Sequence, residues 1–213
     1  MSQLRITEIF HSLQGESTLT GMPTVFVRLT GCPLRCVYCD TDYAFNGGSK
    51  RSLDDIIDEI NSYDCSRVCV TGGEPLAQPE CHELLERLCD SGFEVSLETS
   101  GAMDIADVDS RVMKVMDYKT PASGEMDKNR YENFYFMDAK DQVKFVICDR
   151  KDYDWARMKI SEMAMTDKTQ VLISPSHRVI EPAELAQWIL DDRLDVRMQI
   201  QLHKVLWGDK QGV

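Results

Sequence analysis

The stretch RVCVTGGEPLAQPECHELLERLCDSGFEVSLETSG, residues 67–101, contains the pattern that decides the fold. It begins with a valine-rich, strand-like run at 67–71 and ends with a second such run at 94–99. Between them, residues 79–92 start with a proline, carry leucines on one helical face and stop at Gly92. This order predicts two parallel strands joined by a right-handed crossover, with functional loops at the carboxyl ends of the strands.

The same alternation of strand and helix extends over the rest of the chain. Further strands are predicted at residues 24–29, 112–119, 143–148, 170–174 and 196–202, and further helices at 52–63, 153–165 and 181–192. Ser52 is the predicted N-cap of the first of these helices. An eight-fold barrel typically takes about 250 residues, whereas this chain has 213. We therefore predict an α/β fold, a partial (open) β/α barrel with mainly parallel strands, in a single domain over residues 1–213.

Composition limits the classes of function. The formal net charge is −12 at pH 7, so the summed field repels nucleic-acid backbones and anionic membrane surfaces. The first residues lack the regions of a signal peptide, and no segment approaches the roughly 20 apolar residues of a membrane helix. We expect a cytoplasmic protein without direct nucleic-acid or membrane binding. In that compartment the eight cysteines are thiols or metal ligands rather than disulfides.

Three of these cysteines are clustered in TGCPLRCVYCDT, residues 30–41, where Cys32, Cys36 and Cys39 have the spacing C-x3-C-x2-C. A structural zinc site needs a fourth ligand, such as His11 or a distant cysteine. An iron–sulfur cubane held by three thiolates instead leaves one iron open to bind the amino and carboxylate groups of S-adenosylmethionine. The spacing alone leaves both interpretations open.

Two neighbouring features favour the cluster. TGGEP, residues 71–75, follows a predicted strand and offers glycine backbone where a ligand's amino group can be received. Tyr38 precedes the last cysteine of the triplet. Together, the cysteine spacing and GGEP resemble the radical S-adenosylmethionine superfamily, whose members generate a 5′-deoxyadenosyl radical that abstracts hydrogen from a substrate.

A longer series of motifs narrows this resemblance. In chain order these are SLQGES (12–17), TVFVRLTGCPLRCVYCDT (24–41), VTGGEP (70–75), LETSG (97–101), DYKTP (117–121), VKFVI (143–147), SPSH (174–177) and LHKVLWG (202–208). They resemble the 7-carboxy-7-deazaguanine synthase family over residues 4 to 208. The combination of QGE, FVRLTGCPxRCxYCDT and ETSG is its most specific part.

The resemblance implies a radical SAM core and a lyase that converts 6-carboxy-5,6,7,8-tetrahydropterin to 7-carboxy-7-deazaguanine with loss of ammonia, in queuosine and other 7-deazapurine biosynthesis. It implies a [4Fe-4S] cluster on Cys32, Cys36 and Cys39, and Mg²⁺ on the hydroxyl of Thr41, which otherwise is a loop cap. The residues it implies for S-adenosylmethionine are Tyr38, Gly72, Gly73, Glu74, Gly101, Lys119 and Ser174. A flavodoxin-type electron donor and a homodimer are expected from the same resemblance.

The substrate carries a carboxylate and a guanidine-like pterin edge. Arg28 lies in an otherwise apolar predicted strand, where its planar fork would either clamp that carboxylate or form a structural salt bridge. The resemblance favours the clamp, and it assigns the pterin edge to the turn of Gln14, Gly15 and Glu16, with Thr99 as a further contact. Many relatives carry glycine where this chain has Ser17, so a positive φ there would strain the turn.

Other residues are interpreted as structural. The remaining cysteines lie in apolar patterns and are expected in the core: Cys65, Cys69, Cys81, Cys89 and Cys148. A second cluster on Cys65 and Cys69 is a less favoured alternative. The resemblance implies that His203, in the motif at 202–208, closes over the site; a core or capping role is the alternative, and no chemistry is assigned to it. Two other functions stay open: a radical activase that installs a glycyl radical on a partner protein, and a non-catalytic metal-binding module that kept the fold.

Overall fold

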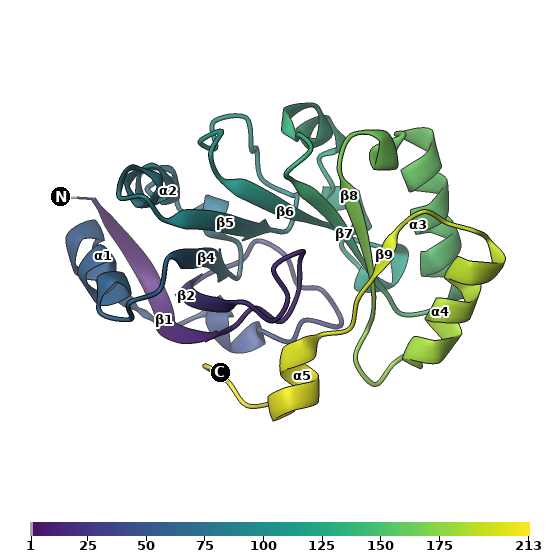
Figure 1. Cartoon of the computed structure of the whole chain (residues 1–213), viewed down its shortest axis with the longest axis horizontal. Coiled ribbons are helices and arrows are strands. Elements are labelled where there is room, and N and C mark those ends of the chain that lie inside the picture. The colour runs from purple at the N-terminus through teal and green to yellow at the C-terminus, as the bar shows by residue number, and fades with distance from the viewer. Residues whose placement is uncertain (1) are drawn as a thin grey trace.

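The computed structural model describes residues 2–213, which form one mostly parallel sheet flanked by helices (Figure 1). The sheet has nine strands in the order β3-β1-β2-β4-β5-β6-β7-β8-β9. Every neighbouring pair from β2 to β9 is parallel, whereas β1 is antiparallel to both β2 and β3. The strands are β1 Gln3–Leu13, β2 Pro23–Leu29, β3 Ser49–Ser52, β4 Arg67–Gly72, β5 Glu94–Thr99, β6 Met113–Tyr118, β7 Gln142–Ile147, β8 Gln170–Pro175 and β9 Arg197–Met198. The predicted open, mainly parallel partial barrel is confirmed.

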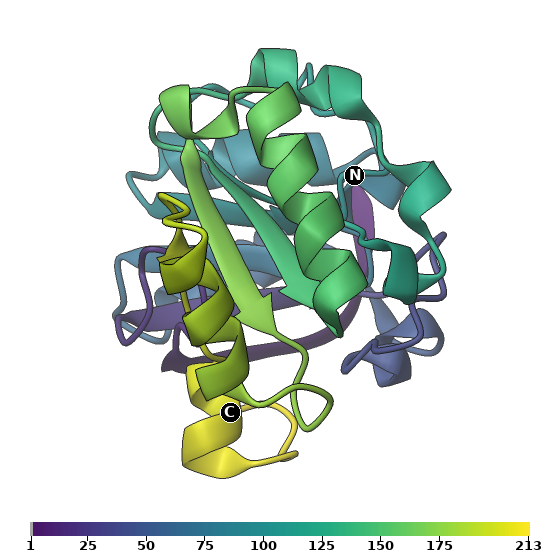
Figure 2. The same cartoon turned by 90° about the vertical axis from the view of Figure 1, so that its right-hand side faces the viewer.

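The longer helices flank the two ends of this sheet. They are α1 Leu53–Asn61, α2 Cys81–Asp90, α3 Arg150–Glu162, α4 Pro182–Asp191 and α5 Leu202–Trp207. Figure 1 shows α1 and α2 at the β1 end, α3 and α4 at the β9 end, and α5 with the C-terminus below the strands. Figure 2 shows α3 and α4 running alongside β7 and β8. Each helix within residues 2–213 is too short or too polar to span a bilayer.

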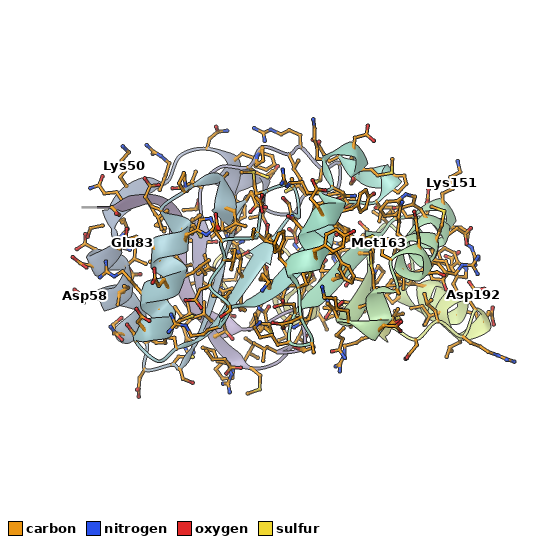
Figure 3. All side chains as sticks on the ribbon, turned by 90° about the horizontal axis from the view of Figure 1, so that it is seen from above. Lys50, Asp58, Glu83, Lys151, Met163 and Asp192 are labelled. Atoms are coloured by element: carbon orange, nitrogen blue, oxygen red, sulfur yellow. The ribbon has the colours of Figure 1, made fainter. Side chains whose placement is uncertain are left out.

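Local signals in the sequence explain several helix ends. The backbone N–H of Asp55 donates to Ser52 Oγ at 3.1 Å, which confirms the predicted N-cap of α1. Gly92 follows α2 with a φ of 84°, in the left-handed region that suits a residue after a helix. Asp54, Asp55 and Asp58 of α1 and Glu83, Glu86 and Asp90 of α2 are exposed, so these two helices carry negative charge on their solvated faces (Asp58 and Glu83 are labelled in Figure 3).

Other predicted boundaries were wrong. The long strand β1 was not predicted, because only Leu4 and Ile6 are fully buried and the rest of the strand shows no continuous apolar run. The strand predicted at 196–202 is only the two-residue β9, an edge strand with β8 as its one neighbour, and the chain from Leu202 becomes α5. Between β6 and β7 the chain is irregular and contains the short 3-10 helices Met126–Lys128 and Tyr131–Phe136.

The buried apolar residues form one continuous hydrophobic cluster between the sheet and the helices. Cys69 and Cys81 are fully buried in it, as predicted. Cys65, Cys89 and Cys148 were expected in the core as well, but they are only partly buried, because they lie at or just beyond the ends of their elements. Trp155 and Trp188 pack against the cluster from the helices, in agreement with a packing role.

Candidate active site

The strand register brings charged residues to one face of the sheet. Glu8 pairs with Arg28 across β1 and β2, and Arg28 pairs with Thr71 across β2 and β4. Thr71 Oγ1 donates to Glu98 of β5 at 3.0 Å. Since paired residues in a sheet point to the same face, these side chains form a polar row.

A cavity of about 660 Å³ opens on this face, a size typical of small-molecule sites. Most of the predicted site residues line it together: Gln14, Gly15, Glu16, Arg28, Cys32, Cys36, Tyr38, Cys39, Thr41, Gly72, Gly73, Thr99 and Lys119. They come from the β1–β2 turn, the loop after β2, and the carboxyl ends of β4, β5 and β6. The tertiary structure thus brings the motifs to one place.

The cysteine loop, residues 30–41, is held against GGEP by backbone hydrogen bonds. Glu74 N–H donates to the Gly31 carbonyl at 2.8 Å, and Gly73 N–H donates to the Leu29 carbonyl at 3.1 Å. A Cβ on Gly73 would lie 2.8 Å from Cys32 Cβ and would clash with the Gly31 backbone. Glycine is therefore required there by the close approach of the two loops.

The three thiols share a partly buried environment. Burial raises the pKa of all three, that of Cys36 to about 11, whereas the nearby ammonium of Lys119 acts in the opposite direction. No group of three His, Cys, Asp or Glu side chains within residues 2–213 converges as the ligands of one metal ion would. A cubane makes a different demand, because each of its protein thiolates binds a different iron atom. Three thiols on one loop, open to one cavity, fit that donor set.

Three residues predicted to bind the cofactor do not line the cavity: Glu74, Gly101 and Ser174. Glu74 is fully buried, and its carboxylate accepts hydrogen bonds from Leu76 N–H at 3.0 Å, from Ser100 N–H at 2.7 Å and from Thr99 Oγ1. Its carboxylate therefore supports the ETSG turn from behind. Gly101 and Ser174 are also buried behind the wall, and Ser174 Oγ has no partner among residues 2–213.

Arg28 is held on one side only. Its Nε donates to Glu8 Oε1 at 2.7 Å, and its guanidinium lies 5.8 Å from the ring centroids of both Phe10 and Tyr43. The salt bridge considered from sequence is thus present. Within residues 2–213, however, the two terminal guanidinium nitrogens donate no hydrogen bond, so they stay available to an anion in the cavity.

The residue after QGE has the positive φ that strains a residue other than glycine. Ser17 has a φ of 68°, in the left-handed region, and Thr20 Oγ1 and Leu19 N–H bond to its carbonyl and hydroxyl oxygens at 2.7 and 3.1 Å. These local bonds offset the strain of a side chain in the left-handed region. Glu16, next to it in the turn, is buried beside the cavity.

Thr41 occupies the N-cap position of the 3-10 helix Asp42–Phe45, but its side chain makes no capping hydrogen bond. Its hydroxyl instead donates to Asp40 Oδ1 at 2.9 Å. The alternative interpretation of Thr41 as a side-chain cap is therefore not supported. Its oxygen lines the cavity beside a carboxylate, which is a donor set that suits Mg²⁺.

The C-terminal segment closes one side of the cavity, as the resemblance of the motif at 202–208 implies for His203. Leu202 N–H donates to the Gly15 carbonyl at 2.9 Å, and a Cβ on Gly15 would collide with the His203 ring. Gln201 Nε2 donates to Asp40 Oδ2 at 3.3 Å. Residues 209–213 also line the cavity.

Two charged residues of the cavity wall were also missed, Asp117 and Lys144. They pair across β6 and β7, and Lys144 Nζ lies 3.7 Å from Asp117 Oδ2. Lys119 Nζ lies 3.2 Å from the other oxygen of Asp117. A lysine in the apolar run VKFVI was a usable signal, like Arg28 in VFVRL.

Comparisons with known proteins agree with this geometry. Residues 26–119 match the radical SAM superfamily. The chain is 44% identical to the 7-carboxy-7-deazaguanine synthase of Koribacter versatilis, over 96% of this chain and 97% of that protein. It is 42% identical to the synthase of Chlorobaculum tepidum, over 99% and 97%. The crystal structure of QueE from Escherichia coli has the same fold, with a TM-score of 0.76 at 21% identity, over 93% of this chain and 94% of that one.

Proposed function

The chain belongs to the 7-carboxy-7-deazaguanine synthase family, within the radical SAM superfamily, and from this premise we propose the reaction that it catalyses. It converts 6-carboxy-5,6,7,8-tetrahydropterin to 7-carboxy-7-deazaguanine with loss of ammonia, in queuosine biosynthesis. The observation that carries the proposal is that the cysteine loop, the QGE turn and Arg28 line one cavity. The cavity thus offers the cysteine loop to the cofactor, Arg28 to the substrate carboxylate and the QGE turn to the pterin edge.

Membership of the superfamily implies a [4Fe-4S] cluster and S-adenosylmethionine, for which Cys32, Cys36 and Cys39 supply the thiolates. When bound, these groups supply the radical that removes a hydrogen atom from the substrate. Gly72 and Gly73 leave backbone exposed beside the cysteine loop for the methionyl end. Tyr38 and Lys119 lie on the same wall, where the Tyr38 backbone would lie under the cofactor and Lys119 would line the nucleoside.

The chain's own residues hold the substrate. The free terminal nitrogens of Arg28 bind its carboxylate as a planar fork. The carboxylate of Glu16 accepts hydrogen bonds from pterin N–H groups, with Gln14 and Thr99 alongside. The Thr41 hydroxyl would be the protein ligand of Mg²⁺, since this ion prefers oxygen ligands and keeps several waters.

Partners and location complete the proposal. A flavodoxin-type protein supplies the electron, the chain works as a homodimer in the cytoplasm, and no nucleic acid is bound directly. The net charge of −12 supports the last point, because it repels phosphate backbones. The eight free cysteines are typical of a reducing compartment.

The test is an anaerobic assay of the reconstituted protein with S-adenosylmethionine, a reductant, Mg²⁺ and 6-carboxytetrahydropterin, with products identified by mass spectrometry. We expect both 7-carboxy-7-deazaguanine and 5′-deoxyadenosine. Deoxyadenosine alone would keep the radical chemistry and reject this substrate, in favour of a protein target. Neither product from a protein with a full cluster would indicate a non-catalytic module.

A further inference from the structure

Lys144 is a buried lysine with no assigned role in binding the cluster or S-adenosylmethionine. It lies beside Glu16, whose carboxylate is the proposed acceptor for the pterin N–H groups. Lys144, in the middle of β7, is buried, and its ammonium forms an ion pair with Glu16 Oε2. Glu16 Oε1 is also buried and has no hydrogen-bond partner within residues 2–213. An unpartnered buried carboxylate oxygen is costly unless a ligand satisfies it. Glu16 therefore has one oxygen held by the protein and one left open on a residue of the cavity wall.

The surroundings of Glu16 are otherwise acidic. Lys144 faces three carboxylates, those of Glu16 on the β1–β2 turn, Asp117 on β6 and Glu98 on β5. More distant charges are Lys119 after β6 and Asp40 of the cysteine loop. Burial alone would lower the pKa of Lys144, but the three carboxylates raise it above the ordinary lysine value, so the ammonium stays charged. The other nearby cation, Lys119, is already paired with Asp117.

Hydrogen bonds fix the turn around this pair. Gln14 accepts from Glu16 N–H at 3.2 Å and donates to Glu98 Oε1 at 3.3 Å. Glu98 is further held by Thr71. Glu98 is thus occupied on both oxygens, whereas Glu16 keeps one free. Of the two, Glu16 is the carboxylate prepared for a ligand.

We propose that Lys144 is a positioning residue for the reaction: its ion pair with Oε2 holds the Glu16 carboxylate turned so that Oε1 accepts the N–H groups of the pterin. This inference rests on the proposed function, and it adds the residue that sets recognition of the pterin edge. Without Lys144, the Glu16 carboxylate would lie among those of Asp117 and Glu98 with no cation in contact. It would then be repelled by its neighbours and lose the orientation that presents Oε1 to the pterin.

The test is the dissociation constant of 6-carboxytetrahydropterin, measured anaerobically by calorimetry at pH 7 on the cluster-loaded protein with S-adenosylmethionine. For Lys144→Met we expect binding at least tenfold weaker, because the Glu16 carboxylate is no longer held. Lys144→Arg should restore most of the affinity, because it keeps the cation. Cluster content and S-adenosylmethionine affinity should match those of the unsubstituted protein.

Two further variants separate positioning from a general structural effect. Lys114→Met removes a buried lysine that is paired with a carboxylate on the opposite face of the sheet, and it should leave pterin affinity unchanged. In a Glu16→Gln background, Lys144→Met should cause no further loss of pterin affinity, because the carboxylate that Lys144 holds is already absent. If Lys144→Met does not fold, Lys144→Gln takes its place in the same series.

Unchanged pterin binding by Lys144→Met, or a loss of equal size in the Glu16→Gln background, would overturn the inference and leave the proposed function intact. A failure of the unsubstituted protein to bind the pterin would overturn the proposed function and this inference together. A normal S-adenosylmethionine affinity in that experiment would show that the cofactor side of the cavity is intact.

Discussion

Two buried lysine–carboxylate pairs stand at different places on the same sheet, and their environments differ. Lys114 of β6 pairs with Asp141, with Nζ 2.9 Å from Oδ2. The Asp141 oxygens also accept from Lys114 N–H at 2.8 Å and from Asp138 N–H at 2.9 Å. Lys144 of β7 pairs with Glu16, which keeps Oε1 without a partner in residues 2–213. In the first pair, both carboxylate oxygens have partners within the protein. In the second pair, one carboxylate oxygen has none among these residues.

The pleat of the sheet explains this difference. Asp117 is level with Lys144 across β6 and β7, and it lines the cavity. Lys114 is three residues away from Asp117 on the same strand, so its side chain points to the opposite face. That face is covered by helices, and Met116 and Tyr118 on it belong to the hydrophobic cluster. A buried carboxylate on the helix face needs hydrogen-bond donors or cations from the protein itself. A buried carboxylate on the cavity face can instead be paired by a bound ligand.

The largest expected effect is on the cavity side, at the cysteines. Replacing Cys36 by Ala should abolish both the cluster and deoxyadenosine formation, because a thiolate ligand is lost. Iron and sulfide content after anaerobic reconstitution, together with deoxyadenosine by mass spectrometry, measures both. Cys69→Ala is the matched control and should keep full iron loading, since Cys69 is buried in β4. Full loading of Cys36→Ala would remove it as a ligand.

The second-largest effect is expected on stability, at Asp141 on the face of the sheet that the helices cover. Asp141→Asn leaves Lys114 buried without a counter-charge and should lower the free energy of unfolding by about 3–5 kcal/mol. The midpoint of anaerobic urea denaturation measures this loss. Asp138→Asn breaks only the exposed pair with Lys140 and should cost about 1 kcal/mol or less. Weakened pterin binding by folded Asp141→Asn would contradict the separation of the two faces.

Arg28→Ala should keep the cluster and lower kcat/KM for the pterin by about 10²–10³-fold, since a charged, bidentate contact is removed. Steady-state kinetics and iron content measure the two quantities. Arg28→Lys should recover only part of the loss, because an ammonium lacks the planar fork. Full product formation by Arg28→Ala would leave the Glu8 salt bridge as its only role.

The smallest effect is expected at Thr41. Thr41→Val removes one oxygen ligand and should raise the Mg²⁺ concentration for half-maximal activity by about tenfold, equivalent to about 1.4 kcal/mol. A titration of activity against Mg²⁺ measures it, with Thr41→Ser as the control that keeps the hydroxyl. An unchanged Mg²⁺ response in Thr41→Val would reject Thr41 as a ligand.

Sequence reasoning succeeded where the signal is local. The crossover unit at 67–101 was predicted with its strands in place, and Ser52 was recognised as a cap, because hydrophobic period and capping act within a few residues. It failed for β1, which has no continuous apolar run, and for the extent of β9. The contact of the Glu74 carboxylate with the ETSG turn could not be predicted either, because it joins residues far apart in the sequence.

The sequence by itself determined the alternation of strands and helices, the cysteine spacing and the motifs that carry the family resemblance. It also contains both Lys114 and Lys144 as single charges in apolar runs, and nothing local distinguishes them. Only the tertiary structure decided between them, because strand register and pleat direction set which face each lysine occupies. The packing of the C-terminal segment over Gly15 was decided in the same way, by contacts between residues nearly the whole chain apart.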